Sequence, residues 1–355
     1  MNRPKGYALV LGAGASYGGK FKTDLTPPLD TGAFQLIEKL CRRKNGSNTV
    51  SGLKPRWNTF LRDSKKAEVS KTRILEARIE EIATLLEARS SIPGLKKKSG
   101  RPPKYSEALA SLKVLICSLL AHTNGTSVCE LHRELITWME PKAVVTFNYD
   151  LVVDATLANL GRLSWGNKLY AGSSKAFQIE GGGRLDKKSL RASRLKDSID
   201  LFKLHGSINW HRLNANSFSL QLGKNRSILD ENRLQADYKH YPADPELILP
   251  VAAKTEIGDD AFGSIWKGAL NRLAEAKGWI VWGYSFPVTD TNALVLFQTA
   301  LKRRKEPKKI IVINPDYQVV GRLRRLLNVS ENSINYYPHI ERYLFRYSRL
   351  TVGAQ

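Results

Sequence analysis

The chain has 355 residues, of which 42% are hydrophobic and 25% charged, a composition typical of a globular protein with a substantial core. No apolar run approaches the length that crosses a bilayer, and the first predicted strand begins too close to Met1 for a signal peptide. We therefore expect a cytoplasmic protein with no membrane partner, while the net charge of +23 favours an anionic one.

The basic residues gather in runs at 42–44, 96–98 and 302–305, with few aromatic side chains between them. A groove for single-stranded nucleic acid places stacking aromatics beside its charges, so specific reading of nucleic acid is disfavoured. Two interpretations of the charge stay open. It serves solubility alone, or it forms a basic surface that faces a partner or the nucleic acid that this partner carries.

Residues 6–12 predict a first strand, which runs into Gly12-Ala13-Gly14-Ala15-Ser16. Glycines after a strand let the backbone turn tightly, and free N–H groups there can face a phosphate. The segment is not a complete dinucleotide fingerprint, because Tyr17 stands at the third glycine position and no strand with an acidic end follows about 20 residues later. A dehydrogenase is therefore disfavoured.

Residues 31–140 predict a helical insertion after this strand. Apolar periodicity indicates a long helix at 71–89 and another at 105–122, whereas polar residues and glycines predict a loop at 44–56. The two long helices carry more apolar surface than a lone domain needs, which favours a homo-oligomer. Two shorter helices are predicted at 31–43 and 127–139.

Strands and helices then alternate, which predicts an α/β fold. We expect a Rossmann-like, mainly parallel sheet with helices on both faces, forming a single domain over residues 1–355 together with the helical insertion. Residues 161–198, rich in Gly, Ser and basic side chains, predict a long excursion. The predicted strands are 143–145, 199–205, 246–250, 278–284 and 308–314, and the predicted helices are 151–160, 260–277 and 290–303.

Polar side chains follow two of these strands. Asn148 and Asp150 come after the run at 143–145, and His205 ends the run at 199–205. In an open α/β sheet, ligands bind at the carboxyl ends of the strands. An Asn, an Asp and a His at that edge can orient a sugar, position a water and take a proton, so these residues are the candidate catalytic group.

Each of these residues also has a structural interpretation. Asn148 is a residue type that favours turns, and Asp150 is well placed to cap the helix that follows it, a role compatible with ligand contact. His211 competes with His205 for the role of base. We favour His205, because it directly follows a strand and because Gly206 would give a substrate room to approach.

Three further residues have two interpretations. Ser16 is an N-cap or a phosphate contact, Asp290 caps its helix or faces the pocket, and Asn314 forms a turn or contacts a ligand. Ser285 is not a hydrolase nucleophile, because Pro287 stands where the nucleophile elbow requires glycine.

The sequence holds no pattern that predicts a metal site. It has three cysteines, and no two of them form a Cys-x-x-Cys pair. We expect reduced, buried thiols at Cys41, Cys117 and Cys129.

Five segments in chain order resemble the sirtuin-like superfamily, above all its bacterial branch of NAD-cleaving effectors in anti-phage defence. The likeness spans most of residues 6–30 and 142–316. The segments are Gly12-Ala13-Gly14-Ala15-Ser16, Thr146-Phe147-Asn148-Tyr149-Asp150, Leu204-His205-Gly206-Ser207, Gly283-Tyr284-Ser285 and Val312-Ile313-Asn314.

The resemblance implies a role for each matching residue. Asn148 and Asp150 would lie beside the nicotinamide ribose of NAD, His205 would be the general base, and Asn314 would hold the adenosine ribose. The residues expected at the phosphates are Gly12, Ala13, Gly14, Ser16, Gly283 and Ser285.

The chain departs from the protein-deacylating sirtuins at several points. Phe147 and Tyr149 replace their Gln and Ile around the asparagine, their Pro-Asp-Phe-Arg segment is missing, and so is their four-cysteine zinc module. We therefore expect no deacylation of peptides and no bound metal.

The resemblance implies a glycohydrolase that cleaves NAD to nicotinamide and ADP-ribose and so depletes NAD during phage infection. It also implies a separately encoded partner, such as a HerA-type ATPase. Two alternatives stay open: a module that senses NAD or ADP-ribose without cleaving it, and a basic nucleic-acid-binding protein.

Overall fold

The structure is a computed structural model that describes most of the chain. The described residues are 4–42, 52–91, 104–162, 177–179, 198–214, 217–220, 245–249, 261–303 and 309–345.

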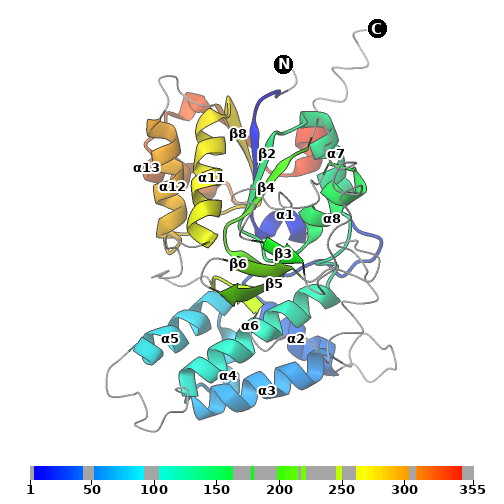
Figure 1. Cartoon of the computed structure of the whole chain (residues 1–355), viewed down its shortest axis with the longest axis vertical. Helices are drawn as coiled ribbons and strands as arrows, with labels where there is room; N and C mark the ends of the chain where they lie inside the picture. The colour runs from blue at the N-terminus through cyan, green and yellow to red at the C-terminus, as the bar shows by residue number, and fades with distance from the viewer. Residues whose placement is uncertain are drawn as a thin grey trace.

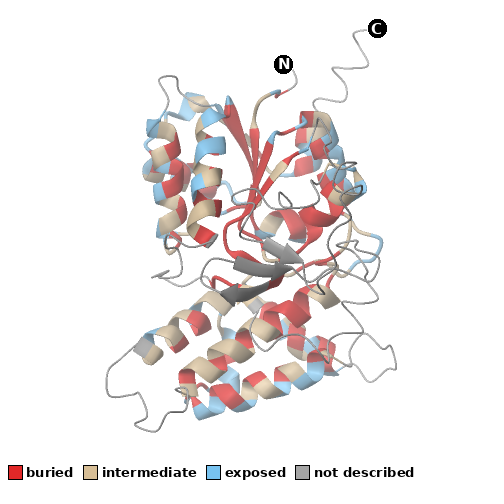
Figure 2. Ribbon diagram, in the orientation of Figure 1, coloured by how far each residue is buried: buried red, intermediate tan, exposed pale blue. Residues whose placement is uncertain are grey.

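A six-stranded sheet forms the centre of the molecule, and all its strands are parallel (Figure 1). The central strand is β1, in which Leu9 lies opposite Val144 on one side and Ile280 on the other. The inner strands are buried almost throughout, as their unbroken apolar runs predict for a parallel sheet covered on both faces (Figure 2). The order is β10 (Ile334–Tyr337), β9 (Lys309–Ile313), β8 (Gly278–Trp282), β1 (Ala8–Leu11), β2 (Ala143–Thr146) and β4 (Asp200–Lys203).

Helices cover both faces of this sheet, which confirms the predicted fold class. One layer contains α11 (Ala261–Glu275), α12 (Thr291–Lys302) and α13 (Gln318–Leu327). The opposite layer contains α7 (Glu130–Met139) and α8 (Val152–Asn159), which contact each other. The short helix α1 (Ala13–Tyr17) directly follows the central strand. Strand β10 and helix α13 lie beyond the last predicted element.

The helical insertion forms a separate layer beyond the carboxyl ends of the strands (Figure 1). Its core is aromatic, with Phe34 stacked on Phe60 at 5.8 Å between ring centroids. Helix α3 begins at Leu53, so the predicted loop ends earlier than residue 56. Helix α7 belongs to the sheet layer rather than to this one. The insertion contains α2 (Ala33–Arg42), α3 (Leu53–Lys66), α4 (Lys71–Glu76), α5 (Ile79–Ser91) and α6 (Lys104–His122).

The prediction of one helix at 71–89 is wrong in one respect, because this segment forms two helices, α4 and α5. Ala77 is extended, with φ −94° and ψ 163°, and separates α4 from α5. Asp30 holds the break: its carboxylate accepts hydrogen bonds from Glu80 N at 3.1 Å and Arg78 Nε at 2.9 Å. An acidic side chain at the start of α5 favours a helix that begins there. Apolar periodicity alone cannot show this break.

The apolar residues of α6 pack in the core of the protein. Leu112, Leu115, Ile116 and Leu119 are buried in the core. The apolar face of α6 is thus covered by the chain itself, and self-association stays a prediction.

A second, smaller sheet holds the segment that was predicted to join the main sheet at 246–250. This segment forms β7 and pairs antiparallel with β5. Gly206 opens β5 with φ +80°, and a Cβ there would lie 2.1 Å from the carbonyl oxygen of Glu246. The glycine therefore makes room for β7 and not, as expected, for a substrate. The strands are β3 (Phe177–Ile179), β6 (Ser217–Leu220), β5 (Gly206–Asn214) and β7 (Pro245–Leu247), in that order.

The predicted excursion at 161–198 lies largely outside the described residues, as does the basic run at 96–98. In the described part of the chain, no helix combines the length and apolar content of a membrane crossing. The same residues include no cluster of His, Cys, Asp and Glu that could hold a metal ion. The three cysteines are buried free thiols, and burial raises the pKa of each.

His132 on α7 is buried and packs on Trp282, with 4.5 Å between ring centroids. Neither ring nitrogen has a hydrogen-bond partner among the described residues, and burial lowers the pKa of His132 to about 3. The unfolded chain takes up a proton at this side chain near pH 6.5, while the folded protein does not. His132 should therefore cost stability as the pH falls from about 6.5 towards 3, by up to about 1.4 kcal/mol per pH unit.

The His132→Phe variant should lose this part of the pH dependence. Urea unfolding of both proteins between pH 7 and pH 4 measures it, and the difference in unfolding free energy should grow in favour of the variant as the pH falls. Parallel curves would show that His132 takes up its proton in the folded state.

Candidate functional site

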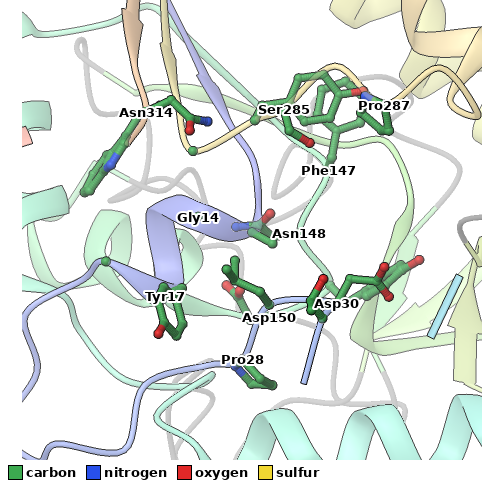
Figure 3. A pocket seen from close by; sticks show the side chains of 18 of the residues that line it. Gly14, Tyr17, Pro28, Asp30, Phe147, Asn148, Asp150, Ser285, Pro287 and Asn314 are labelled. Carbon is green, nitrogen blue, oxygen red and sulfur yellow. The ribbon is translucent and has the colours of Figure 1, made fainter. Parts of the chain in front are cut away.

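A cavity of about 660 Å³ lies at the carboxyl ends of the main strands. This volume lies within the range of ligand-binding pockets. The insertion closes its far side with residues such as Arg78 and Leu119. Most of the site residues predicted from sequence line it: Ala13, Gly14, Asn148, Asp150, His205, Gly283, Ser285 and Asn314. Figure 3 shows Asn148 between Gly14 and Asp150, with Ser285 and Asn314 on one side of it and Asp30 on the other.

Two hydrogen bonds to the first loop fix the amide of Asn148. Its Nδ2 donates to the carbonyl oxygen of Gly12 at 3.0 Å and to Ser16 Oγ at 3.1 Å. A carbonyl can only accept, so this contact determines which end of the amide is nitrogen. Oδ1, the other end, is buried and has no hydrogen-bond partner among the described residues. A buried acceptor of this kind is rare in folded proteins and suits a ligand or water that supplies a donor.

Gly12 and Ser16 lie behind the cavity and support Asn148. Ser16 is buried, and its hydroxyl also bonds to the carboxylate of Asp150. The contact of Gly12 and Ser16 with phosphates stays a prediction. In the structure, Gly12 holds the amide of Asn148, and Ser16 connects Asn148 with Asp150.

The glycines of the first loop bring two loops together. Gly283 has φ +69°, and a Cβ there would lie 2.0 Å from Ala15 N. The N–H groups of Gly12 and Gly14 donate to the carbonyl oxygens of Trp282 and Gly283, each at 3.0 Å. The sequence predicted that these N–H groups are free to face a phosphate. In the structure they form hydrogen bonds within the protein instead.

Asp150 caps a helix and also lines the cavity. Its Oδ1 accepts a hydrogen bond from Val152 N at 3.0 Å, at the start of α8. Burial raises the pKa of Asp150, and the nearby ammonium of Lys203 and the Ser16 hydroxyl act in the opposite direction. The two interpretations of this residue are thus compatible, as expected.

A buried ion pair lies beneath this loop. Lys203 on β4 and Asp154 on α8 are 2.9 Å apart between Nζ and Oδ2, and neither side chain is exposed. The ammonium of Lys203 also donates to the carbonyl oxygen of Asp150. Lys203 therefore ties β4, the loop after β2 and α8 together beneath the site.

His205 follows β4 and is held among aromatic rings. The edge of the ring packs against Phe147, with centroids 5.2 Å apart at 69°, and Phe147 stacks on Tyr284 at 4.2 Å. His205 Nε2 lies 3.3 Å from Asp290 Oδ2. The sequence could not separate two roles for Asp290; the structure places it in the pocket, with no side-chain hydrogen bond that caps α12.

Asn314 also combines its two interpretations. Its Oδ1 accepts a hydrogen bond from Asp316 N at 2.9 Å, which forms a turn, and the residue lines the cavity. Nearby, the guanidinium of Arg322 joins the two loops of this side, since it donates to Ser285 O at 3.1 Å and to Asp316 Oδ2 at 2.8 Å.

The described lining of the cavity is acidic although the whole chain is strongly basic. It holds one guanidinium, from Arg78, which is paired with Asp30. Fixed carboxylates stabilise positive charge that develops in a cavity shielded from water. The carboxyl groups of the lining are Asp30, Glu80, Asp150, Asp290 and Glu341.

Comparison of the sequence with protein-family models and with curated proteins finds no match. Among solved structures, the chain is similar to one described as "Structural Basis for the Mechanism and Regulation of Sir2 Enzymes". The two are 14% identical, the match covers 90% of this chain and 99% of the other, and the TM-score is 0.35. A TM-score of 0.35 is too low to establish a shared fold. The α/β assignment rests on the order and register of the sheet itself.

Proposed function

We propose that the protein is an NAD glycohydrolase, which cleaves NAD to nicotinamide and ADP-ribose. The observation that carries the proposal is the buried, unpartnered Oδ1 of Asn148, a residue that lines the same cavity as His205. A ribose hydroxyl or a water would supply the missing donor to Oδ1, and the imidazole would take a proton from it.

In this proposal, the chemistry fits the charge of the cavity. Cleavage forms a bond between the oxygen of water and C1′ of the ribose, while the bond from C1′ to the nicotinamide nitrogen breaks. Nicotinamide leaves as a neutral molecule with the electron pair of that bond, and His205 accepts the proton of the water. Positive charge develops on the ribose, and the carboxylates that line the cavity favour it.

The remaining residues would bind the rest of NAD. Asp150 would lie beside the nicotinamide ribose, and Asn314 would hold the adenosine ribose. Gly14, Gly283 and Ser285 would lie along the phosphates. These placements follow the resemblance of the motifs, and all of these residues line the one cavity.

The chain should release nicotinamide from NAD, at least under activating conditions, because Asn148 and His205 line the same cavity. Chromatography of nicotinamide and ADP-ribose, over a range of protein concentrations, measures the release. Calorimetry with ADP-ribose measures binding at the same time. Binding without release at any concentration, both with and without a candidate partner, would show a sensor. DNA binding that weakens steeply with salt, without affinity for NAD, would show a nucleic-acid-binding protein.

We also propose that the enzyme depletes NAD as an effector of anti-phage defence and is restrained until it assembles, with itself or with a separate partner such as a HerA-type ATPase. An unrestrained NAD hydrolase would kill its own host. Mass measurement in solution, paired with the assay across concentrations, tests the restraint. A strict monomer that hydrolyses NAD at full rate would contradict it.

A further inference from the structure

Asp290 reaches from one side of the cavity to His205 on the other. It belongs to the loop between β8 and α12, while His205 follows β4 at the opposite part of the sheet. The backbone of Asp290 serves the turn and the helix: its N–H donates to Pro287 O at 3.0 Å, and its carbonyl accepts from Leu294 N at 3.1 Å. The side chain is directed to the imidazole instead, 3.3 Å from Nε2.

A second donor fixes this carboxylate. The hydroxyl of Tyr284 donates to the same Oδ2 at 2.9 Å. Burial, followed by the charge of Asp290, raises the pKa of Tyr284 well above its usual value, so the phenol keeps its proton and remains a donor. Tyr284 is itself held by its stacking on Phe147, which packs against the edge of His205. Carboxylate, phenol and imidazole thus form one buried network.

We propose that Asp290 is a positioning residue for His205 in the hydrolysis proposed above, on which this inference rests. A carboxylate accepts hydrogen bonds only, so neutral His205 carries its proton on Nε2 and its basic lone pair on Nδ1. When Nδ1 takes the proton of the attacking water, Asp290 stabilises the imidazolium and takes no proton itself. A base oriented by a buried carboxylate is a recurring arrangement in hydrolytic enzymes.

The Asp290→Asn variant keeps the size of the side chain and removes its charge. It should lower kcat for nicotinamide release by about 10- to 100-fold, with KM for NAD changed by less than about threefold, because the base and not substrate binding is affected. Asp200→Asn is the control, since this carboxylate lies at the start of β4, at the other end of the strand from the cavity, and binds Arg272. It should leave kcat unchanged.

A double-mutant cycle separates positioning from a general structural role. If Asp290 acts through the imidazole, Asp290→Asn should lower the rate by less than about twofold when His205 is already alanine. An equal loss in both backgrounds would overturn the proposal. Tyr284→Phe keeps the stacked ring and removes one hydrogen bond, and it should give a smaller loss than Asp290→Asn.

A measurement that needs no turnover distinguishes this inference from the proposed function. Nitrogen NMR of the six imidazoles, with His205→Gln to identify the signal, reports the tautomer of His205. The wild-type protein should show the proton on Nε2, and Asp290→Asn should show a mixture. A proton on Nδ1 in the wild type would overturn the inference even if NAD is hydrolysed. The expected tautomer with no release of nicotinamide would count against the proposed function alone.

Discussion

Replacing His205 with alanine should lower the rate of nicotinamide release by about 10²-fold or more, the usual effect of removing a positioned acid–base group. The ring lies at the end of β4, in the same cavity as Asn148, and its orientation is fixed by contacts with Phe147 and Asp290. Alanine leaves no group to accept a proton there. Initial rates at saturating NAD measure the loss.

Asn148→Ala should show a loss of similar size, because it removes the buried acceptor Oδ1 and the hydrogen bonds that hold this amide to Gly12 and Ser16. His211→Ala is the control for both variants, since His211 lies further along β5, and its effect should be mild. Circular dichroism and thermal unfolding establish that each variant is folded. Full turnover by folded His205→Ala would show that the base is assigned wrongly.

Replacing Lys203 with methionine should lower the free energy of unfolding by about 3–5 kcal/mol, the usual cost of removing one partner of a buried ion pair. Methionine fills a similar space, but it takes the ammonium of Lys203 away from the carboxylate of Asp154 and from the carbonyl of Asp150. Urea unfolding at pH 7 measures the change.

The double variant Lys203→Met with Asp154→Leu should recover most of this loss, because apolar residues of similar volume often replace a buried pair at little cost. Arg324→Met is the matched control: it breaks an exposed pair with Glu331, for which the expected change is below about 1 kcal/mol. A loss below about 1 kcal/mol for Lys203→Met as well would show that the buried carboxylate of Asp154 does not depend on Lys203.

The carboxyl-edge position of Asn148 and His205 was predictable from sequence for a physical reason. Each follows an apolar run, and parallel strands that pair side by side must end at the same edge. No contact between distant segments is needed to infer that the two residues are neighbours. The helix layers followed in the same way from the alternation of elements.

Contacts between distant segments explain what the sequence did not show. Asp30 breaks the helix predicted at 71–89, yet it precedes Arg78 by 48 residues. Asp290 at the start of a helix has the ordinary pattern of a cap, and only the fold brings it to His205. Gly206 likewise needs its positive φ because the backbone of Glu246 lies against it.

The central place of β1 determines how the chain must fold. Leu9 pairs with Val144 on β2 and with Ile280 on β8. The first strand to be synthesised can therefore pair on both sides only after β8 has been synthesised. At ~5–20 residues per second, β8 follows β1 by roughly 14–54 s. During that time the apolar strand Ala8–Leu11 lacks its neighbour on one side, while α2 to α6, which mainly contact one another, can already form. We therefore expect long-range closure around the first strand to be the slow step of folding, and the nascent chain to be most exposed to aggregation before it occurs.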